Sequence, residues 1–107
     1  MKFTLPHTIE SGLGETMVFK EIIKDPDSEK VIIEGRCKPT AGPAMHVHLK
    51  QDEALTVVKG KMGCQIPGQE PVYYTVGQTA TFLRNVPHRF WNAGDDELVI
   101  SSWVKPV

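Results

Sequence analysis

Turn-forming residues recur along this chain at short intervals, and this spacing limits what it can fold into. Eight prolines and nine glycines are distributed over 107 residues. The runs between them are short and rich in β-branched and aromatic residues, which favour strands. No segment of the sequence shows the sustained period of an amphipathic helix. Short runs separated by turn signals about every eight to twelve residues predict an all-β sandwich or barrel.

The expected strands follow from these runs. The first two, at 15–23 and 31–38, flank a polar turn that contains Pro26 and therefore predict a hairpin. The remaining expected strands, with a turn at 50–52 after the first of them, span 44–49, 53–59, 61–66, 72–76, 80–82, 88–92 and 97–104.

Length and charge restrict the organisation and the partners of the chain. A chain of 107 residues fits one domain, which we place at 15–107 as a β-barrel, preceded by an N-terminal arm or edge strand over 1–14. The net charge is −1 with both signs interspersed, unlike the basic stripe of a nucleic-acid-binding protein. The N-terminus has no apolar run that would suit a signal peptide or a membrane span. We therefore expect a cytoplasmic protein that binds neither nucleic acid nor membranes.

Three histidines and one glutamate are spaced so that they can meet at one point. His46 and His48 fall in the strand expected at 44–49, where alternate side chains share a face. Glu53 begins the next expected strand across a short turn, and His88 lies far downstream. Imidazole and carboxylate groups together suit a divalent transition metal. The sequence therefore predicts a metal site formed by His46, His48, Glu53 and His88.

Each of these residues alone has a more ordinary interpretation. A single histidine on a strand is more often hydrogen-bonded than bound to a metal. Glu53 alone could be a solvated turn residue, and His88 alone could be a surface residue after a proline turn. The prediction of a metal site therefore depends on all four residues together. His7 lies outside the pattern, and we expect it to be exposed to solvent.

The residues around His88 predict an apolar wall beside the site. Alternation places His88, Phe90 and Asn92 on one face of the expected strand, and Arg89 and Trp91 on the other. An apolar wall lowers the local dielectric and limits access of water to a bound ion.

The two cysteines, Cys37 and Cys64, form no C-x-x-C pair. We expect both to pack as small core thiols, although either could line the cavity.

The two clusters resemble the motifs of the cupin family. These motifs run Gly-x5-His-x-His-x3/4-Glu-x6-Gly and Gly-x5-Pro-x-Gly-x2-His-x3-Asn. The matching positions of this chain are His46, His48, Glu53, Gly60, Gly77, His88 and Asn92. The motifs and their spacer extend over 42–92, so the resemblance covers most of the chain.

Three positions depart from the cupin motifs. Thr40 stands where the first glycine is expected, with Gly42 two residues later, and Leu83 and Asn85 replace the proline and glycine of the second motif. None of these changes removes a ligand. Asparagine tolerates the left-handed backbone of such a turn better than most residues.

The resemblance implies an all-β antiparallel jelly-roll barrel, the double-stranded β-helix of the cupins, with a metal inside one open end. His46, His48, Glu53 and His88 match the four ligands of the family position by position. The implied cofactor is manganese, iron, nickel or zinc. The resemblance also implies a homodimer, to which Trp91 and Trp103 could contribute unless they fill the core of their own barrel.

Three functions remain open for such a site. A divalent ion with three neutral imidazoles and one carboxylate keeps a positive charge and about two open positions, which suit a chelating anion, water or dioxygen. The chain could be a metal-dependent enzyme on a small organic substrate, of the dioxygenase or the isomerase and epimerase type. It could instead bind or sense a small molecule without catalysis, or use the metal for stability. Glu34, Arg36 and Gln51 could supply an acid or base, or lie on the solvated surface.

Overall fold

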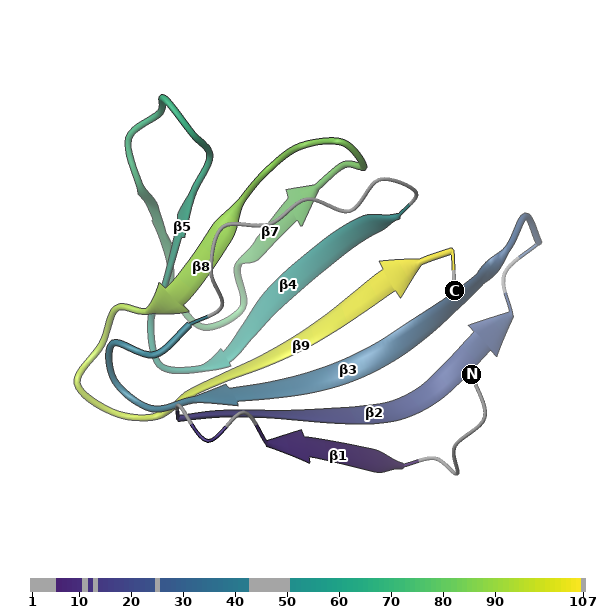
Figure 1. Ribbon diagram of the computed structural model, residues 1–107, viewed down its shortest axis with the longest axis horizontal. Coiled ribbons are helices and arrows are strands. Elements are labelled where there is room, and N and C mark those ends of the chain that lie inside the picture. The colour runs from purple at the N-terminus through teal and green to yellow at the C-terminus, as the bar shows by residue number, and fades with distance from the viewer. Residues whose placement is uncertain (1–5, 11, 13, 25, 43–50, 107) are drawn as a thin grey trace.

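Two antiparallel sheets face each other in the computed structural model, which describes residues 6–10, 12, 14–24, 26–42 and 51–106. The large sheet has the order β1-β2-β3-β9-β4-β7 and the small sheet the order β6-β5-β8 (Figure 1). The nine strands formed by the described residues are β1 (His7–Glu10), β2 (Glu15–Lys24), β3 (Glu29–Cys37), β4 (Asp52–Lys59), β5 (Met62–Gln65), β6 (Val72–Tyr74), β7 (Thr79–Phe82), β8 (Arg89–Asn92) and β9 (Leu98–Lys105).

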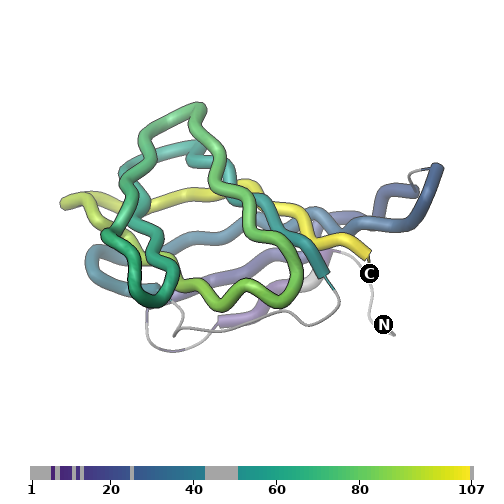
Figure 2. Tube along the Cα trace, turned by 90° about the horizontal axis from the view of Figure 1, so that it is seen from above, coloured from purple at the N-terminus to yellow at the C-terminus, as the bar shows by residue number. Residues whose placement is uncertain are grey.

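The small sheet covers only one end of the large one. In Figures 1 and 2 the teal and green segments that include β5 and β8 lie over one half of the long strands, and the ends of β2 and β3 extend beyond them. No helix in the described part of the chain has the length and apolar character needed to cross a membrane.

The predicted all-β antiparallel architecture is confirmed. Each expected strand within the described ranges has a counterpart, although β8 begins at Arg89 and β6 ends at Tyr74. The strand expected at 44–49, with His46 and His48, lies outside the described residues. Residues 7–10 form β1, which pairs with β2 at the edge of the large sheet.

Alternating side chains build the core. Along β3, the residues Val31, Ile33, Gly35 and Cys37 are buried while their neighbours are more exposed, as the period of a strand requires. The buried apolar residues fall into two groups. The larger lies between the sheets and contains Cys37, Leu55, Val57, Met62, Cys64, Ala80, Phe82, Leu98 and Ile100. The smaller contains Val31, Ile33 and Val104, with Phe19 packed against it.

Thr40 adopts a backbone conformation that normally requires glycine. Its φ is +66°, in a turn closed by the Ala41 amide, which donates to the Lys38 carbonyl at 3.0 Å. The turn is tied to β8, because the Thr40 amide donates to the Asn92 carbonyl at 3.2 Å and the Asn92 amide donates to the Ala41 carbonyl at 2.9 Å. The left-handed backbone is thus kept although the glycine of the motif is absent. The expectation for Asn85 is also confirmed, with a φ of +69°.

The strain at Thr40 can be tested by substitution. A β-branched residue at positive φ is disfavoured, so Thr40→Gly is expected to raise the free energy of unfolding by about 1 kcal/mol. Asn85→Gly, at the other left-handed position, serves as a matched control with a smaller expected gain, because asparagine tolerates this conformation. Urea unfolding of the three proteins measures both differences. A loss of stability in Thr40→Gly would contradict the assigned strain.

Candidate metal centre

Two of the four predicted ligands meet inside the barrel. The Nε2 atom of His88 lies 2.7 Å from Oε1 of Glu53, although 35 residues separate them in the chain. Only 1% of the His88 surface and 8% of the Glu53 surface are exposed. Burial of a carboxylate is unfavourable unless a partner compensates it, so this pair is a constrained feature of the interior.

Strand register and ring stacking place this pair. Glu53 in β4 lies opposite Phe82 in β7. The imidazole of His88 stacks on the Phe82 ring, with the centroids 4.0 Å apart and the planes 2° from parallel. Phe82 therefore positions the His88 ring beside the strand that carries Glu53.

The other ring nitrogen of His88 is held by the backbone. Its Nδ1 atom lies 2.9 Å from the Val86 carbonyl oxygen, which can only accept a hydrogen bond. Nδ1 therefore carries the proton, and in a neutral ring Nε2 presents its lone pair to the Glu53 carboxylate. Two acceptors at 2.7 Å are stabilised by a cation shared between them or by a proton on the ring. Metal-bound histidines usually donate their other N–H to a carbonyl or carboxylate in this manner, so the pair fits a metal site.

The remaining predicted ligands, His46 and His48, lie outside the described residues. Within the described ranges, no three or more His, Cys, Asp or Glu side chains form a group that could hold a metal ion. The side chain of His7 is also outside the description, although its backbone belongs to β1.

An ion pair beside the site fixes the relative position of its two segments. Arg84 donates to Asp52 Oδ1 from its amide at 2.7 Å and from Nε at 3.1 Å, and to Oδ2 from Nη2 at 3.1 Å. These hydrogen bonds, with those from the side chain dominant, hold the pKa of Asp52 below its usual value. Asp52 immediately precedes Glu53, and Arg84 lies in the loop that leads to His88. Sequence analysis missed this pair, because nothing in the pattern links a turn aspartate to an arginine 32 residues later.

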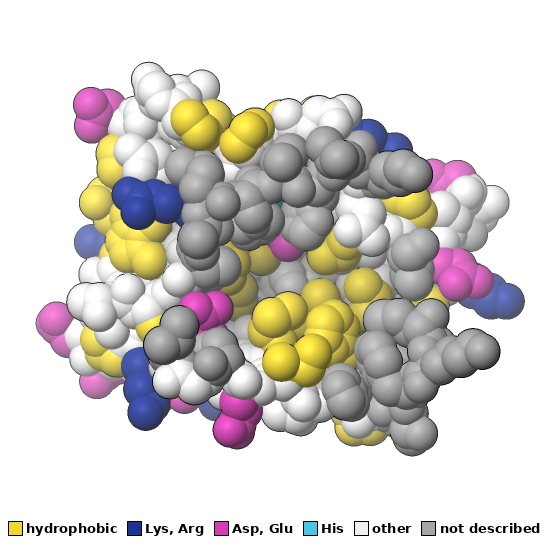
Figure 3. Space-filling view, in the orientation of Figure 1, with side chains coloured by type: hydrophobic (Ala, Val, Ile, Leu, Met, Phe, Trp, Pro, Cys, Tyr) yellow, Lys and Arg dark blue, Asp and Glu magenta, His cyan; other side chains and the backbone are white. Residues whose placement is uncertain are grey.

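A cavity of about 440 Å³ opens from the Glu53 carboxylate along the large sheet. Its walls come from residues of β2, β3, β4, β8 and β9 and from Gln51, which precedes β4. Figure 3 shows hydrophobic side chains around a hollow near the centre of one face, with an acidic group inside it. The described lining residues are Glu15, Thr16, Met17, Phe19, Val31, Ile33, Gly35, Arg36, Cys37, Gln51, Glu53, Leu55, Phe90, Ile100, Ser102 and Val104.

The predicted facing of the strand after His88 is confirmed. Phe90 lines the cavity and Asn92 is buried, while Arg89 is exposed. Trp91 is half-buried on the other face, where its ring lies 6.2 Å from Tyr73 and covers Gly63. Trp103 is half-buried, with Lys30 placed 5.9 Å from its ring centroid.

The three polar candidates for acid–base roles have structural contacts. Arg36 is exposed and pairs with Glu97 at 3.1 Å and with Glu34 at 3.5 Å. Gln51 lines the cavity, and its Nε2 donates to the Pro106 carbonyl at 2.8 Å. The surface interpretation of Arg36 is thus confirmed, whereas Gln51 is a wall residue.

Both cysteines are buried as free thiols, as expected. Burial raises the pKa of Cys37 to about 11 and that of Cys64 to about 12. Cys37 also lines the cavity. At neutral pH both groups are therefore thiols rather than the thiolates that act as nucleophiles or metal ligands.

The inert character of these thiols is directly measurable. At pH 8 a pKa of about 11 leaves about one Cys37 side chain in a thousand ionised. We expect a disulfide reagent such as 5,5′-dithiobis(2-nitrobenzoate) to label neither cysteine of the folded protein within minutes at this pH. In guanidinium chloride both should react. Rapid labelling of one thiol in the folded state would contradict the burial described here.

Comparison with known proteins identifies the family. Residues 34–104 match the Cupin_2 family, which is described as the cupin domain. This chain belongs to the cupin family. The match includes Glu53, His88, the whole small sheet and, from the large sheet, β4, β7 and most of β9. The fold inferred from the motifs is thereby supported by sequence as well as by architecture.

Individual relatives of this cupin differ in the roles that their names state. Over 67 residues, or 61% of the chain, it is 33% identical to the oxidoreductase iacF of Pestalotiopsis fici. The chain spans one third of that protein's length. The structure of KdgF from a Halomonas species superposes with a TM-score of 0.73 and 17% identity, over 94% of this chain and 87% of that one. A sugar phosphate isomerase of Silicibacter pomeroyi gives 0.70 and 16%, over 88% and 60%. At such identities the two structures establish the fold alone.

Proposed function

We propose that this cupin binds a divalent transition metal through His46, His48, Glu53 and His88. We further propose that it is a metal-dependent enzyme acting on a small organic substrate, with chemistry of the oxygenase or the isomerase and epimerase type. The observation that carries the proposal is the 2.7 Å contact between Glu53 Oε1 and His88 Nε2 at the cavity.

The residues of the chain have separate roles in this proposal. When bound, a divalent ion of this kind supplies Lewis-acid or redox chemistry. The Val86 carbonyl keeps the proton of His88 on Nδ1, so that Nε2 remains available as a ligand. Phe82 fixes the plane of that ring, and the Asp52–Arg84 pair holds the two segments together. Phe90 and the apolar walls exclude water from the substrate.

The named relatives support the two types of chemistry. The relative of highest sequence similarity reported above is called an oxidoreductase, and one structural neighbour is called a sugar phosphate isomerase. Both reaction types require a substrate that is bound close to the reacting group. An open metal position beside a cavity of this size would meet that requirement.

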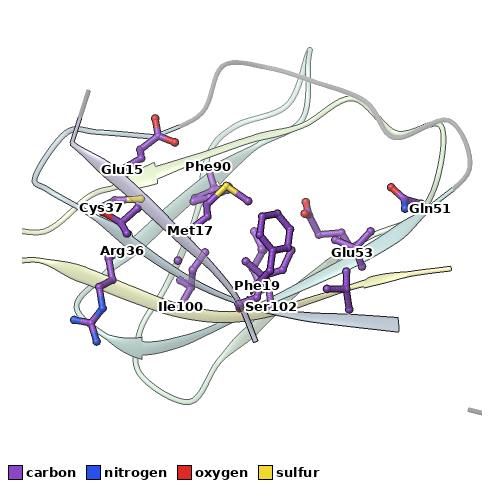
Figure 4. A pocket seen from close by; sticks show the side chains of 16 residues that line it. Glu15, Met17, Phe19, Arg36, Cys37, Gln51, Glu53, Phe90, Ile100 and Ser102 are labelled. Atoms are coloured by element: carbon purple, nitrogen blue, oxygen red, sulfur yellow. Dashed lines mark hydrogen bonds between the residues drawn. The ribbon is translucent and has the colours of Figure 1, made fainter. Parts of the chain in front are cut away.

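A second function has a specific observation in its favour. Beyond Glu53, the ionisable residues in the described lining are Glu15, Arg36 and Cys37. In Figure 4 the charged groups of Glu15 and Arg36 point away from the space between the walls, and Cys37 is a protonated thiol. A cavity with few acid or base groups also suits a module that binds or senses a small molecule without converting it.

Metal content tests the ligand assignment. His48→Ala, His88→Ala and Glu53→Gln are each expected to reduce stoichiometric metal to below about one tenth, because each removes one donor of a shared site. His7→Ala, a histidine outside the motifs, is the control and should retain the metal. Elemental analysis of proteins purified without a chelating column, with circular dichroism to verify folding, measures this. Equal metal in wild type and the three ligand variants would refute the assignment.

Coordination of nitric oxide separates an open site from a closed one. A protein loaded with Fe(II) and exposed to nitric oxide is expected to give the electron paramagnetic resonance signal of a half-integer-spin iron nitrosyl, since four protein ligands leave about two positions free. Glu53→Gln, which loses the metal, should give none. A wild-type protein that binds iron stoichiometrically but not nitric oxide would instead favour a metal used only for stability.

A further inference from the structure

Every strand that contributes to the cavity walls supplies at least one apolar side chain. Met17 and Phe19 come from β2, and Phe90 from β8. The other apolar wall residues from the large sheet are Val31, Ile33, Leu55, Ile100 and Val104. Figure 4 shows Met17, Phe19 and Phe90 directed into the same space as the Glu53 carboxylate. Apolar surface around a concave site favours ligands with apolar surface of their own.

Polar groups are few in the described walls, and two of them have hydrogen-bond acceptors within the protein. The hydroxyl of Ser102 donates to the Ile33 carbonyl at 3.3 Å. The amide nitrogen of Gln51 donates to the Pro106 carbonyl at 2.8 Å. A sugar has several hydroxyl groups, and each one buried without a partner is unfavourable. These walls therefore disfavour a polyhydroxylated ligand.

Phosphate recognition is also unsupported by the described lining. Among those residues the only cationic side chain is Arg36. Its Nη1 lies 3.1 Å from Glu97 Oε1 and its Nη2 lies 3.5 Å from Glu34 Oε1, so two carboxylates already neutralise it. Its guanidinium also points away from the cavity in Figure 4. Within the described lining, an anionic group on the body of a ligand would face an apolar wall without a compensating charge.

From these observations we infer that the cavity takes a small molecule with an apolar body and a single polar end placed at Glu53, rather than a sugar or a sugar phosphate. This inference rests on the proposed function, because it takes the same cavity as the substrate site. It adds the class of molecule that the cavity binds. It distinguishes this chain from the structural neighbour named as a sugar phosphate isomerase. Binding of the apolar body itself requires no metal.

Competition on the wild-type protein tests the ligand class. N-phenyl-1-naphthylamine, an uncharged apolar fluorophore, is expected to bind one molecule per chain with enhanced emission. 3-Phenylpropan-1-ol, which has an apolar body and one hydroxyl group, should displace it at a concentration at least about tenfold lower than glucose 6-phosphate. Equal or better displacement by glucose 6-phosphate, or failure of the fluorophore to bind, would overturn the inference.

A matched pair of variants localises the binding. Met17 and Ile22 both belong to β2 and both are 38% exposed, but only Met17 is among the cavity residues. Met17→Glu should weaken binding of the fluorophore roughly tenfold, because it removes apolar contact and adds a charge to the wall. Ile22→Glu should leave binding unchanged, and thermal unfolding of both variants monitors folding. Equal effects of the two substitutions would place the fluorophore elsewhere and overturn the inference.

Failure of the inference can be told apart from failure of the proposed function. Wild-type protein that has been stripped of metal with a chelator is expected to bind the fluorophore within about twofold of the untreated protein, since the apolar walls remain. If the protein binds metal stoichiometrically but does not bind the fluorophore, the inferred ligand class alone is refuted. Fluorophore binding in a protein that never takes up metal would refute the metal assignment alone.

Discussion

The contact between the Glu53 carboxylate and the His88 imidazole is the constraint on which the rest of the site depends. A carboxylate inside a largely apolar barrel is tolerated only with a compensating partner at short range. The partner reaches it through a series of contacts: the β4–β7 register, the Phe82 ring that supports the imidazole, and the Val86 carbonyl that fixes its proton. Each contact is unremarkable alone. Together they hold two polar atoms 2.7 Å apart across the interior.

The departures from the cupin motifs show which property of those motifs the fold retains. Thr40 and Asn85 replace glycines, yet both keep the positive φ that glycine would adopt. The turn at Thr40 remains attached to Asn92 of β8 by two backbone hydrogen bonds. Both positions therefore have a backbone conformation that glycine would also adopt, and Asn85 lies three residues before His88 in the chain. Residue identity can vary wherever another side chain tolerates the same backbone angles.

Much of the fold could be predicted from the sequence, because alternation and turn residues are local signals. The facing of Phe90 and Asn92 and the left-handed turn at Asn85 follow from such signals. The contribution of β2 to the cavity could not be predicted in this way. Alternation puts Met17 and Phe19 on one face of β2, but it does not say which face of the strand turns toward the cavity. The Asp52–Arg84 pair was equally invisible, since only the folded chain brings the two residues together.

The division of the apolar core into two groups has a consequence for motion. The group between the sheets is packed from both sides, whereas among the described residues it is Phe19 of β2 that packs against Val31, Ile33 and Val104. Segments with less packing open at lower free energy than the remainder of a domain. The part of β2 at 21–24, which pairs with β3 but has no pairing with β1 among the described residues, is thus expected to open locally. The small sheet and the Glu53–His88 pair can stay folded when it does. Amide hydrogens there are expected to exchange sooner than those of β9, which is paired on both sides.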